Sequence, residues 1–331
     1  MFTVLAGTLL YIVYDMYNYG VASNAFYRRK GMPFAIGIAG DSGTGKSTML
    51  TIIEECFGKN NILQIEGDGD HRWERGADEW NTFTHLNPKA NYIYRQAKDI
   101  AQLKKGASIH RVEYDHDTGK FTEPHRITPR KYIVLSGLHA FYLPQMRRVF
   151  DLKIYMDTDE ILRRFWKIKR DTSKRGYSFE KILEQIEVRI PDTLQYITPQ
   201  RAYADLIVSY FDKNLKDCCD MEHEVELSLK FTLSSSVDVE PLMVSLSRYG
   251  INIEHDFSQD LEQQSVIFYG NDLNLVKIDF NEVRKMCQDW AYLMKGIEFV
   301  VIDKVDGIEL KDAINSIKEK VFCSQFSESI I

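Results

Sequence analysis

The chain contains, at residues 34–48, the segment FAIGIAGDSGTGKST. Its first part, residues 34–39, is a short apolar run typical of a strand that is buried in a parallel sheet. Its second part, residues 40–48, matches the pattern G-x-x-x-x-G-K-[ST], and a helical stretch, residues 49–57, follows directly. A strand, a glycine-rich loop and a helix in this order predict a phosphate-binding loop in an α/β protein whose doubly wound sheet is mostly parallel.

The residue types of this loop suit the phosphates of a nucleotide. Gly40, Gly43 and Gly45 let the backbone curl until its N–H groups point at phosphate oxygens. Lys46 is placed to reach the β- and γ-phosphates, and the hydroxyl of Ser47 to coordinate Mg²⁺. We therefore expect a P-loop NTPase-type fold. The expected nucleotide-binding residues are Gly40, Asp41, Ser42, Gly43, Thr44, Gly45, Lys46, Ser47 and Thr48.

The composition is that of an ordinary globular protein. The 331 residues are 44% apolar and 27% charged, which excludes a disordered chain, a collagen and a polytopic membrane protein. Five cysteines without a C-x-x-C pair are too few for a disulfide scaffold, so we expect a reducing compartment. The net charge of −6 argues against a nucleic-acid partner. Residues 1–217 carry +5 and residues 218–331 carry −11, so an anionic ligand is expected on the first part.

Two further apolar runs end in residues that can do chemistry. Residues 62–65 are followed by Asp68, and the carboxyl end of a strand in a doubly wound sheet faces the ligand crevice. Asp68 is therefore placed to accept a proton from a substrate hydroxyl; a turn rich in Asp and Gly is the alternative interpretation. The run at 132–135 ends in Ser136, where a P-loop protein usually has a carboxylate linked to Mg²⁺.

A strongly basic segment follows the apolar run at residues 152–156. Seven of the thirteen residues at 163–175 are Lys or Arg, on a predicted helix and the loop after it. One interpretation is a solvated helix whose basic C-terminal end the helix dipole favours. The other is the movable basic lid that P-loop kinases close over the phosphates. The place of the segment, after the phosphate loop, favours the lid.

Residues 1–30 form an apolar N-terminal segment with a basic end. Residues 1–27 contain no Lys or Arg, and an Arg-Arg-Lys triplet occupies 28–30. The apolar run at 2–14 is shorter than the roughly 20 residues of a membrane-spanning helix, unless the tyrosines after it form an interfacial belt. A membrane anchor through residues 2–27, a helix packed on the protein's own surface and a misassigned start remain open. In each case the rest of the chain is expected in the cytoplasm, so that an anchor, if residues 2–27 form one, would hold it at the inner face of a membrane.

From about residue 34 to residue 210, the chain resembles the phosphoribulokinase/uridine kinase family of P-loop kinases, and within it the plant and cyanobacterial type of phosphoribulokinase. The motifs occur in the order of the family, and several are specific. They are the loop at 40–48, Asp68-x-x-His71 with Arg75, LNPKAN at 86–91, YDHDTG at 114–119, GLH at 137–139, K-I-x-R-D at 167–171 with Arg175-Gly176, Pro199-Gln200 and Tyr-Ala-Asp at 203–205.

The resemblance implies ATP and Mg²⁺ as cofactors and a phosphorylated sugar as acceptor. It implies that Asp68 is the catalytic base, with Lys46 and Arg170 also catalytic. His71 as a satisfied core histidine, and Tyr114 and His116 as plain hairpin residues, are the alternatives. The substrate-binding residues that it implies are His71, Arg75, Tyr114, His116, His139, Lys167 and Arg175.

Three positions depart from the family. Ser136 stands where the family has a glutamate tied to Mg²⁺. Thr44 stands where the plant-type enzyme has a regulatory cysteine, so thiol switching is not expected. Asp70 stands where the family has an aromatic residue, and we expect it to supply the carboxylate that Ser136 lacks, directly or through water; the alternative is that Asp70 points to solvent in a turn. The expected metal ligands are Ser47, Asp68 and Asp70.

The expected architecture has three parts. Residues 1–30 form the N-terminal helix, residues 33–216 the P-loop kinase domain, and residues 217–331 an acidic α+β region. The inserts at 68–108 and 115–130 are expected to form the acceptor site and its rim. The C-terminal region is either added to the main sheet or stands beside it, and a homodimer is expected. Its predicted elements are strands at 224–233, 266–269 and 298–302 and helices at 239–249, 280–295 and 310–322.

Three functions compete. The first is a kinase that transfers the γ-phosphate of ATP to a hydroxyl of a phosphorylated sugar. The second is a kinase for uridine or another uncharged acceptor, which the cationic set of His71, Arg75 and Arg175 disfavours. The third is a nucleotide-binding regulatory protein that Ser136 has made catalytically impaired.

Overall fold

A computed structural model describes residues 8–9, 11–12, 32–247 and 251–270 of the chain, with the backbone alone at 55–56, 174–175, 241 and 245. The other residues include those of the helices and the strand predicted at 280–322, which therefore lie outside the described part.

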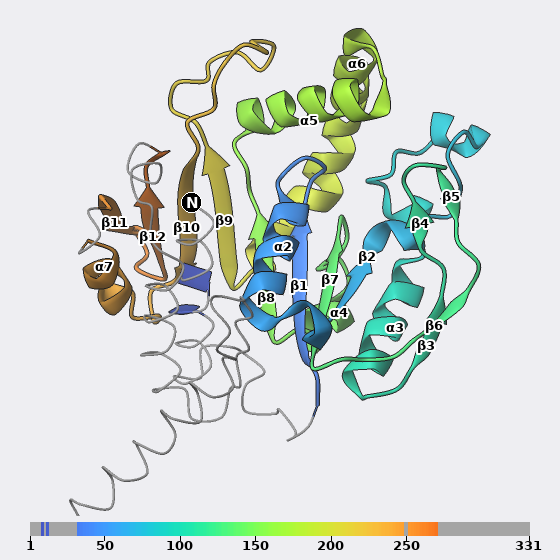
Figure 1. Ribbon diagram of the computed structural model, residues 1–331, viewed down its shortest axis with the longest axis horizontal. Helices are drawn as coiled ribbons and strands as arrows, with labels where there is room; N and C mark the ends of the chain where they lie inside the picture. The colour runs from blue at the N-terminus through green and yellow to red at the C-terminus, as the bar shows by residue number, and fades with distance from the viewer. Residues whose placement is uncertain (1–7, 10, 13–31, 248–250, 271–331) are drawn as a thin grey trace, which may run out of the picture.

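One eight-stranded sheet organises the molecule, in the order β11-β12-β10-β9-β8-β1-β7-β2 (Figure 1). The five strands from β9 to β2 are parallel, which confirms the predicted doubly wound, mostly parallel sheet. The parallel strands are β1 (Phe34–Gly40), β2 (Ile62–Glu66), β7 (Tyr132–Gly137), β8 (Leu152–Met156) and β9 (Leu206–Phe211).

The three strands described in the C-terminal region extend this sheet. β10 (Ser228–Ser234) pairs antiparallel with β9, and β12 (Gln263–Phe268) and β11 (Ile253–Phe257) continue beyond it in antiparallel order. The helix α7 (Glu240–Ser247) covers this part. The sequence left open whether the C-terminal region extends the main sheet or stands beside it. The described strands of this region extend the main sheet.

Alternating side chains of the parallel strands fill two apolar layers. Ile36 and Ile38 of β1 pack on one face with α2 (Lys46–Phe57), whereas Ala35 and Ala39 pack on the other face with α3 (Ile93–Lys104). This is the period of two that a strand buried on both faces requires. α4 (Pro144–Val149) lies in the second layer, where Met146 is fully buried.

The helices α5 (Glu160–Arg175) and α6 (Phe179–Asp192) lie above the carboxyl ends of the central strands (Figure 1). The side chain of Asp159 caps α5 by accepting hydrogen bonds from the backbone N–H groups of residues 161 and 162, and Ser178 caps α6. Gly176 ends α5 in the left-handed conformation, with φ of 66°. A π-helical turn, η6 (Thr193–Ile197), and a 3₁₀ helix, η7 (Thr198–Tyr203), lead from α6 toward β9.

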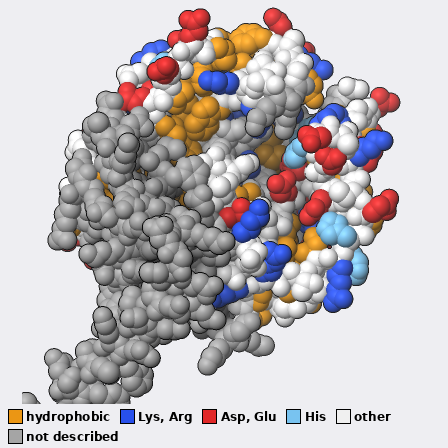
Figure 2. Space-filling model, viewed as in Figure 1, with side chains coloured by type: hydrophobic (Ala, Val, Ile, Leu, Met, Phe, Trp, Pro, Cys, Tyr) orange, Lys and Arg blue, Asp and Glu red, His pale blue; other side chains and the backbone are white. Residues whose placement is uncertain are grey.

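The insert between β2 and β7 carries short elements that the sequence did not predict. Figure 2 shows that acidic, basic and histidine side chains gather over this part of the molecule. Besides α3, the insert contains the 3₁₀ turns η3 (Gly67–Asp70), η4 (Asp78–Asn81) and η5 (Pro88–Ala90), the ribbon of β3 (Ile109–Arg111) with β6 (His125–Ile127), and the ribbon of β4 (Tyr114–Asp115) with β5 (Lys120–Phe121).

The described residues of the N-terminal segment are buried in the protein. Leu9, Tyr11 and Ile12 are 1%, 4% and 1% exposed and belong to the same apolar layer as α2 and α7. The Tyr11 hydroxyl donates a 2.5 Å hydrogen bond to the carbonyl oxygen of Asp238. Among the described residues, no helix has both the length and the apolar character needed to cross a membrane.

Candidate active site

The phosphate loop connects β1 to α2 through glycines in conformations that other residues rarely adopt. φ is 147° at Gly40, 87° at Gly43 and 88° at Gly45. A Cβ atom on Gly40 would lie 2.7 Å from the carbonyl oxygen of Met156, and one on Gly45 would lie 2.9 Å from the ring of Tyr210. Backbone conformation and close neighbours therefore both require glycine here.

Lys46 is the first residue of α2 and its ammonium group lies on the phosphate loop. Its Nζ donates hydrogen bonds to the carbonyl oxygens of Gly40 (2.9 Å) and Asp41 (2.6 Å). Burial lowers the pKa of Lys46 to about 8, although the negative charges of Asp41 and Asp68 oppose this shift. The next side chain, Ser47, is exposed. A cation and a hydroxyl thus stand together where the helix begins, a position that favours an anion.

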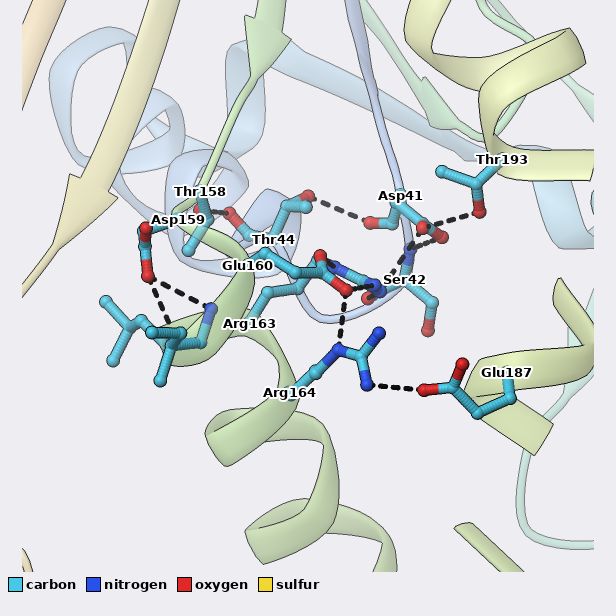
Figure 3. Close-up of polar contacts among 12 residues, drawn as sticks. Asp41, Ser42, Thr44, Thr158, Asp159, Glu160, Arg163, Arg164, Glu187 and Thr193 are labelled. Atoms are coloured by element: carbon cyan, nitrogen blue, oxygen red, sulfur yellow. Dashed lines mark hydrogen bonds and ion pairs between the residues drawn. The ribbon is translucent and has the colours of Figure 1, made fainter. Parts of the chain in front are cut away.

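A chain of polar contacts ties the phosphate loop to the elements around it (Figure 3). The Asp41 carboxylate lies 3.2 Å from the guanidinium of Arg163 in α5, and it accepts a 3.0 Å hydrogen bond from Thr193 in η6. Behind the loop, the Thr158 hydroxyl donates to the carbonyl oxygen of Thr44 at 2.8 Å. The side chain of Asp41, one of the expected nucleotide-binding residues, therefore binds other groups of the protein.

Asp68 follows β2 and lies between two imidazoles. Its oxygens are 3.6 Å from Nε2 of His71 and 3.3 Å from Nε2 of His116, and its side chain is 33% exposed. Burial by itself raises the pKa of Asp68, but His71, His116 and Lys46 outweigh it, so the pKa lies below its ordinary value. Asp68 is therefore an ionised carboxylate at the carboxyl end of a strand, able to accept a proton.

His71 and Asn91 pair within the insert that follows β2. The His71 ring is 4% exposed, and its Nδ1 is 2.7 Å from Oδ1 of Asn91 while its Nε2 faces Asp68. His71 therefore lies beside Asp68 and also has a buried hydrogen bond. The first contact agrees with a role in the site, and the second agrees with a satisfied core histidine.

An aromatic cluster beside His71 contains His85, which sequence reasoning missed. The His85 ring stacks on Trp80 with centroids 3.8 Å apart and lies 4.9 Å from the His71 ring. Burial, with His71 and Arg189 adding to it, lowers the pKa of His85 to about 3, so the imidazole is neutral near pH 7. The one available signal was its position directly before the LNPKAN motif.

The basic face of α5 meets the loop and contains a carboxylate of its own. Lys167 is buried and donates a 2.8 Å hydrogen bond to Asp171, whose other oxygen accepts one of 2.8 Å from Arg170. Burial, aided by Arg189 of α6, lowers the pKa of Lys167 to about 8. Asp171 was part of the K-I-x-R-D motif but was not singled out as a site residue. The side chain of Arg175 lies outside the described part.

Tyr114 and His116 come to Asp68 from the β4–β5 ribbon. Their rings pack edge to face with centroids 5.2 Å apart, and Tyr114 lies 5.8 Å from His71. Arg75 holds this ribbon, because its guanidinium donates to the carbonyl oxygens of His116 (2.5 Å) and Asp117 (3.3 Å). The structure thus brings Tyr114 and His116 to the site, and Arg75 supports the turn that carries His116.

The contacts of Asp70 give it a structural role in place of the expected metal role. Its carboxylate is 2% exposed and accepts hydrogen bonds from Arg95 (3.1 Å), Gln96 (3.0 Å) and Arg111 (3.1 Å). Both oxygens are therefore occupied by protein donors. Neither the metal hypothesis for Asp70 nor the alternative of a solvent-exposed turn agrees with this geometry.

His139 is likewise occupied. Its Nε2 is 2.8 Å from the carbonyl oxygen of Leu86 and its side chain is buried. Burial lowers the pKa of His139 to about 4, so the neutral ring donates that hydrogen bond near pH 7. These contacts favour a structural role for His139 over the expected contact with the substrate.

Ser136 is buried at the carboxyl end of β7, and its neighbour in the sheet is Glu66 of β2. The Glu66 side chain is 59% exposed, and its carboxylate lies 3.8 Å from Nε2 of His116. The carboxylate of Glu66 therefore lies on the strand next to Ser136, the position at which the family has a glutamate. Sequence reasoning missed Glu66 because strand register is not visible in the sequence.

A pocket opens beside Asp68 and joins several of these groups. It is bounded by the ends of β2 and β7 and by the start of α3. Its lining residues are Gly67, Asp68, Asp70, His71, Asn91, Ile93, Gln96, Leu138 and His139.

Comparison with known proteins agrees with this arrangement. Residues 35–216 match the model of the Phosphoribulokinase / Uridine kinase family. The chain is 32% identical over 276 residues to a phosphoribulokinase of Synechocystis sp., covering 78% of this chain and 81% of that protein. It is 33% identical over 197 residues to the chloroplastic phosphoribulokinase of Spinacia oleracea, covering 54% of this chain and 49% of that protein. The chain therefore spans about half the length of this plant relative.

Two further matches extend the comparison. A uridine kinase of Ligilactobacillus salivarius is 29% identical over 192 residues, covering 54% of this chain and 86% of that protein. The solved structure of phosphoribulokinase from Rhodobacter spheroides shares the fold, with a TM-score of 0.55 and 18% identity, covering 80% of this chain and all of that one. From the family match over residues 35–216 and the cyanobacterial relative, the chain belongs to the phosphoribulokinase/uridine kinase family.

Proposed function

We propose that this protein is an ATP-dependent kinase that transfers the γ-phosphate to a hydroxyl group of a small phosphorylated sugar. The observation that carries the proposal is the placement of Asp68. An ionised carboxylate stands at the carboxyl end of β2, in electrostatic contact with Lys46 of the phosphate loop. A base beside a nucleotide site is what a hydroxyl acceptor requires.

In the proposed reaction, Asp68 takes the proton of the acceptor hydroxyl as its oxygen forms a bond to the γ-phosphorus. The bond between that phosphorus and the β–γ bridging oxygen breaks, and ADP leaves. Lys46 and Arg170 place positive charge where negative charge develops on the transferring group. Arg170 carries a guanidinium nitrogen that is buried and has no partner among the described residues, so it retains a free donor.

Oxygen donors suited to Mg²⁺ are present around the loop. Mg²⁺ prefers carboxylate, hydroxyl and phosphate oxygens. Ser47 and Asp68 would hold the ion, and Glu66 is the further carboxylate that the strand register places beside Ser136. When bound, Mg²⁺ would neutralise charge on the nucleotide phosphates.

Two cationic side chains, Lys167 and Arg189, favour an acceptor that carries a negative charge. Lys167 of α5 and Arg189 of α6 interact electrostatically with each other and with the neighbourhood of His85. An uncharged nucleoside gains nothing from such a cluster, whereas a phosphate gains charge-assisted hydrogen bonds. The relatives named phosphoribulokinase support the same acceptor class. The relative named uridine kinase keeps a nucleoside as the second candidate.

The test is turnover of MgATP with a panel of acceptors, measured as ADP release with Asp68→Asn as the matched control. The panel contains pentose and hexose monophosphates, the corresponding free sugars, uridine and cytidine. We expect turnover with one or more sugar phosphates and none with free sugars. Turnover with uridine alone supports the second candidate, and ATP binding without any turnover supports the impaired regulatory protein.

A further inference from the structure

The phosphate loop contains a negative charge of its own. Asp41 is the second residue of the loop and is 7% exposed. One of its carboxylate oxygens accepts a hydrogen bond from the backbone N–H of Ser42, and the other faces Arg163 at 3.2 Å and the hydroxyl of Thr193 at 3.0 Å. Two hydrogen-bond donors and one guanidinium, from three parts of the chain, thus converge on one carboxylate, as Figure 3 shows.

Arg163 is the cation in this arrangement, and its own orientation is fixed. Its Nε and Nη2 donate to both oxygens of Glu160, at 2.7 and 2.8 Å, while its Nη1 donates to the carbonyl oxygen of Ser42 at 3.2 Å. The Arg163 side chain is 8% exposed. A guanidinium held in two places by a carboxylate cannot rotate away from the loop without breaking both hydrogen bonds.

The charge of Asp41 needs this partner because the loop binds an anion. Like charges at close range in a poorly solvated site repel strongly. Burial lowers the pKa of Arg163, but Glu160 and Asp41 outweigh it, so the pKa lies above its ordinary value and the guanidinium stays charged. With Arg163 present, the loop does not expose an uncompensated negative charge to the phosphates.

The same contact fixes the distance between the loop and the basic face of α5. Lys167 lies one helical turn beyond Arg163, and Arg170 lies almost two turns beyond it. A Cβ atom on Gly43 would lie 3.4 Å from the carbonyl oxygen of Arg163 and 3.5 Å from Cβ of Lys167, so the loop packs directly on this helix. Holding Arg163 to the loop therefore also places Lys167 and Arg170.

We propose that Arg163 is a positioning residue for phosphoryl transfer: it neutralises Asp41 within the phosphate loop and sets the position of Lys167 and Arg170 over the nucleotide phosphates. The inference rests on the proposed function, since it takes the loop as the ATP site.

A double-mutant cycle separates the two parts of this role. Arg163→Met leaves Asp41 charged and unpaired, so the dissociation constant of MgATP, measured by calorimetric titration, rises on the order of 30-fold or more. Adding Asp41→Asn removes the repelling charge and restores most of the affinity. The kcat of the double variant stays low, because the polar contacts of the Arg163 side chain that fix α5 against the loop are then absent.

Two further variants keep the test interpretable. Arg164→Met, on the same helix, removes the neighbouring arginine, whose contacts are with Glu160 and Glu187 and not with the loop; its MgATP affinity and kcat stay near those of the unaltered chain. Arg163→Lys keeps the charge without the paired hydrogen bonds, so it retains ATP affinity and loses kcat. Thermal melting of each variant shows whether it is folded, and Arg163→Lys carries the test if Arg163→Met does not fold.

Each outcome decides a different point. The inference is wrong if Arg163→Met binds MgATP as tightly as the unaltered chain, or if Asp41→Asn fails to restore affinity in a folded double variant. If the unaltered chain itself binds no MgATP, the proposed function fails and the inference fails with it.

Discussion

At the scale of single residues, the charge of Asp68 is set by its neighbours. The positive groups around it outweigh the cost of burial. Replacing Asp68 with Asn keeps the shape of the side chain and removes its capacity to accept a proton. We expect Asp68→Asn to retain MgATP affinity and to lower kcat by roughly 10²–10⁴-fold, the range of general-base contributions. Turnover near that of the unaltered chain would show that Asp68 is not the base.

The same neighbours predict the pH dependence of turnover. A base works when it is deprotonated, and the lowered pKa of Asp68 keeps it so to a more acidic pH than an ordinary aspartate. His116→Gln removes one of the positive charges that lower this pKa. The acidic limb of the profile of kcat/KM against pH should therefore move to higher pH in His116→Gln, and stay in place in Tyr114→Phe. An unmoved limb in His116→Gln would contradict the electrostatic account.

Glu66 is expected to matter for the Mg²⁺ requirement, and Asp70 is not. Glu66→Gln removes the exposed carboxylate beside Ser136, so we expect the Mg²⁺ concentration for half-maximal turnover to rise about tenfold. Asp70→Asn should leave that concentration unchanged and lower stability, because Arg111, 3% exposed, loses the charge of one of its two carboxylate partners. Equal Mg²⁺ curves for Glu66→Gln and the unaltered chain would exclude Glu66 from the site.

How far the sequence could predict the site depends on what each residue contacts. Residues in contiguous motifs, such as Lys46 and Asp68, are fixed by the strand and loop that contain them, and the sequence places them well. Asp70 could not be placed, because its partners Arg95 and Arg111 come from elements 25 and 41 residues away. The Glu66–Ser136 neighbourhood depends on strand register in the same way.

At the scale of elements, apolar runs predicted four of the five parallel strands. The fifth, β9, is as apolar as the others, but it directly follows the Tyr-Ala-Asp motif at 203–205 and was not predicted. The ribbons β3–β6 and β4–β5 have two or three residues a strand, too short for a periodic pattern. The sequence also could not show that β10 pairs with β9. A strand with alternating apolar and polar residues can extend an existing sheet or belong to a separate one.

The antiparallel strands share the apolar core of the phosphate-binding half, which predicts one cooperative unit. Phe231 of β10 is fully buried in the same layer as Ile36 and Ile38 of β1. Phe231→Ala should lower the free energy of unfolding by about 3–5 kcal/mol, measured by denaturant titration. ATP binding and secondary structure should be lost in one transition. Val244→Ala, on the 54% exposed Val244 of α7, is the control with little effect. Two separate transitions would mean that the strands fold independently.

At the scale of the whole molecule, buried neutral histidines predict how stability depends on pH. The pKa of His139 is about 4 and that of His85 about 3, both lowered mainly by burial. The unfolded chain, with ordinary histidine pKa values of about 6.5, binds more protons than the folded one below that pH. This part of the stability is complete above pH 6.5 and is lost as the pH falls toward 4.

Denaturant titrations at pH 7.5, 6.0 and 5.0 measure this loss. The free energy of unfolding should decrease at each step, and it should decrease less in His139→Asn, whose amide can still donate to the carbonyl oxygen of Leu86. A pH dependence that is the same in His139→Asn and in the unaltered chain would contradict the assignment to His139.

The contact between Tyr11 and Asp238 also bears on how the chain is made. The two residues are 227 positions apart, so at roughly 5–20 residues per second a ribosome needs roughly 11 to 45 s to deliver Asp238 after Tyr11. During that interval the apolar layer of Leu9, Tyr11 and Ile12 lacks the residues of α7, although the phosphate loop and the five parallel strands are synthesised before Asp238. The apolar layer that contains Leu9, Tyr11 and Ile12 is therefore complete only late in synthesis, once α7 has followed β10.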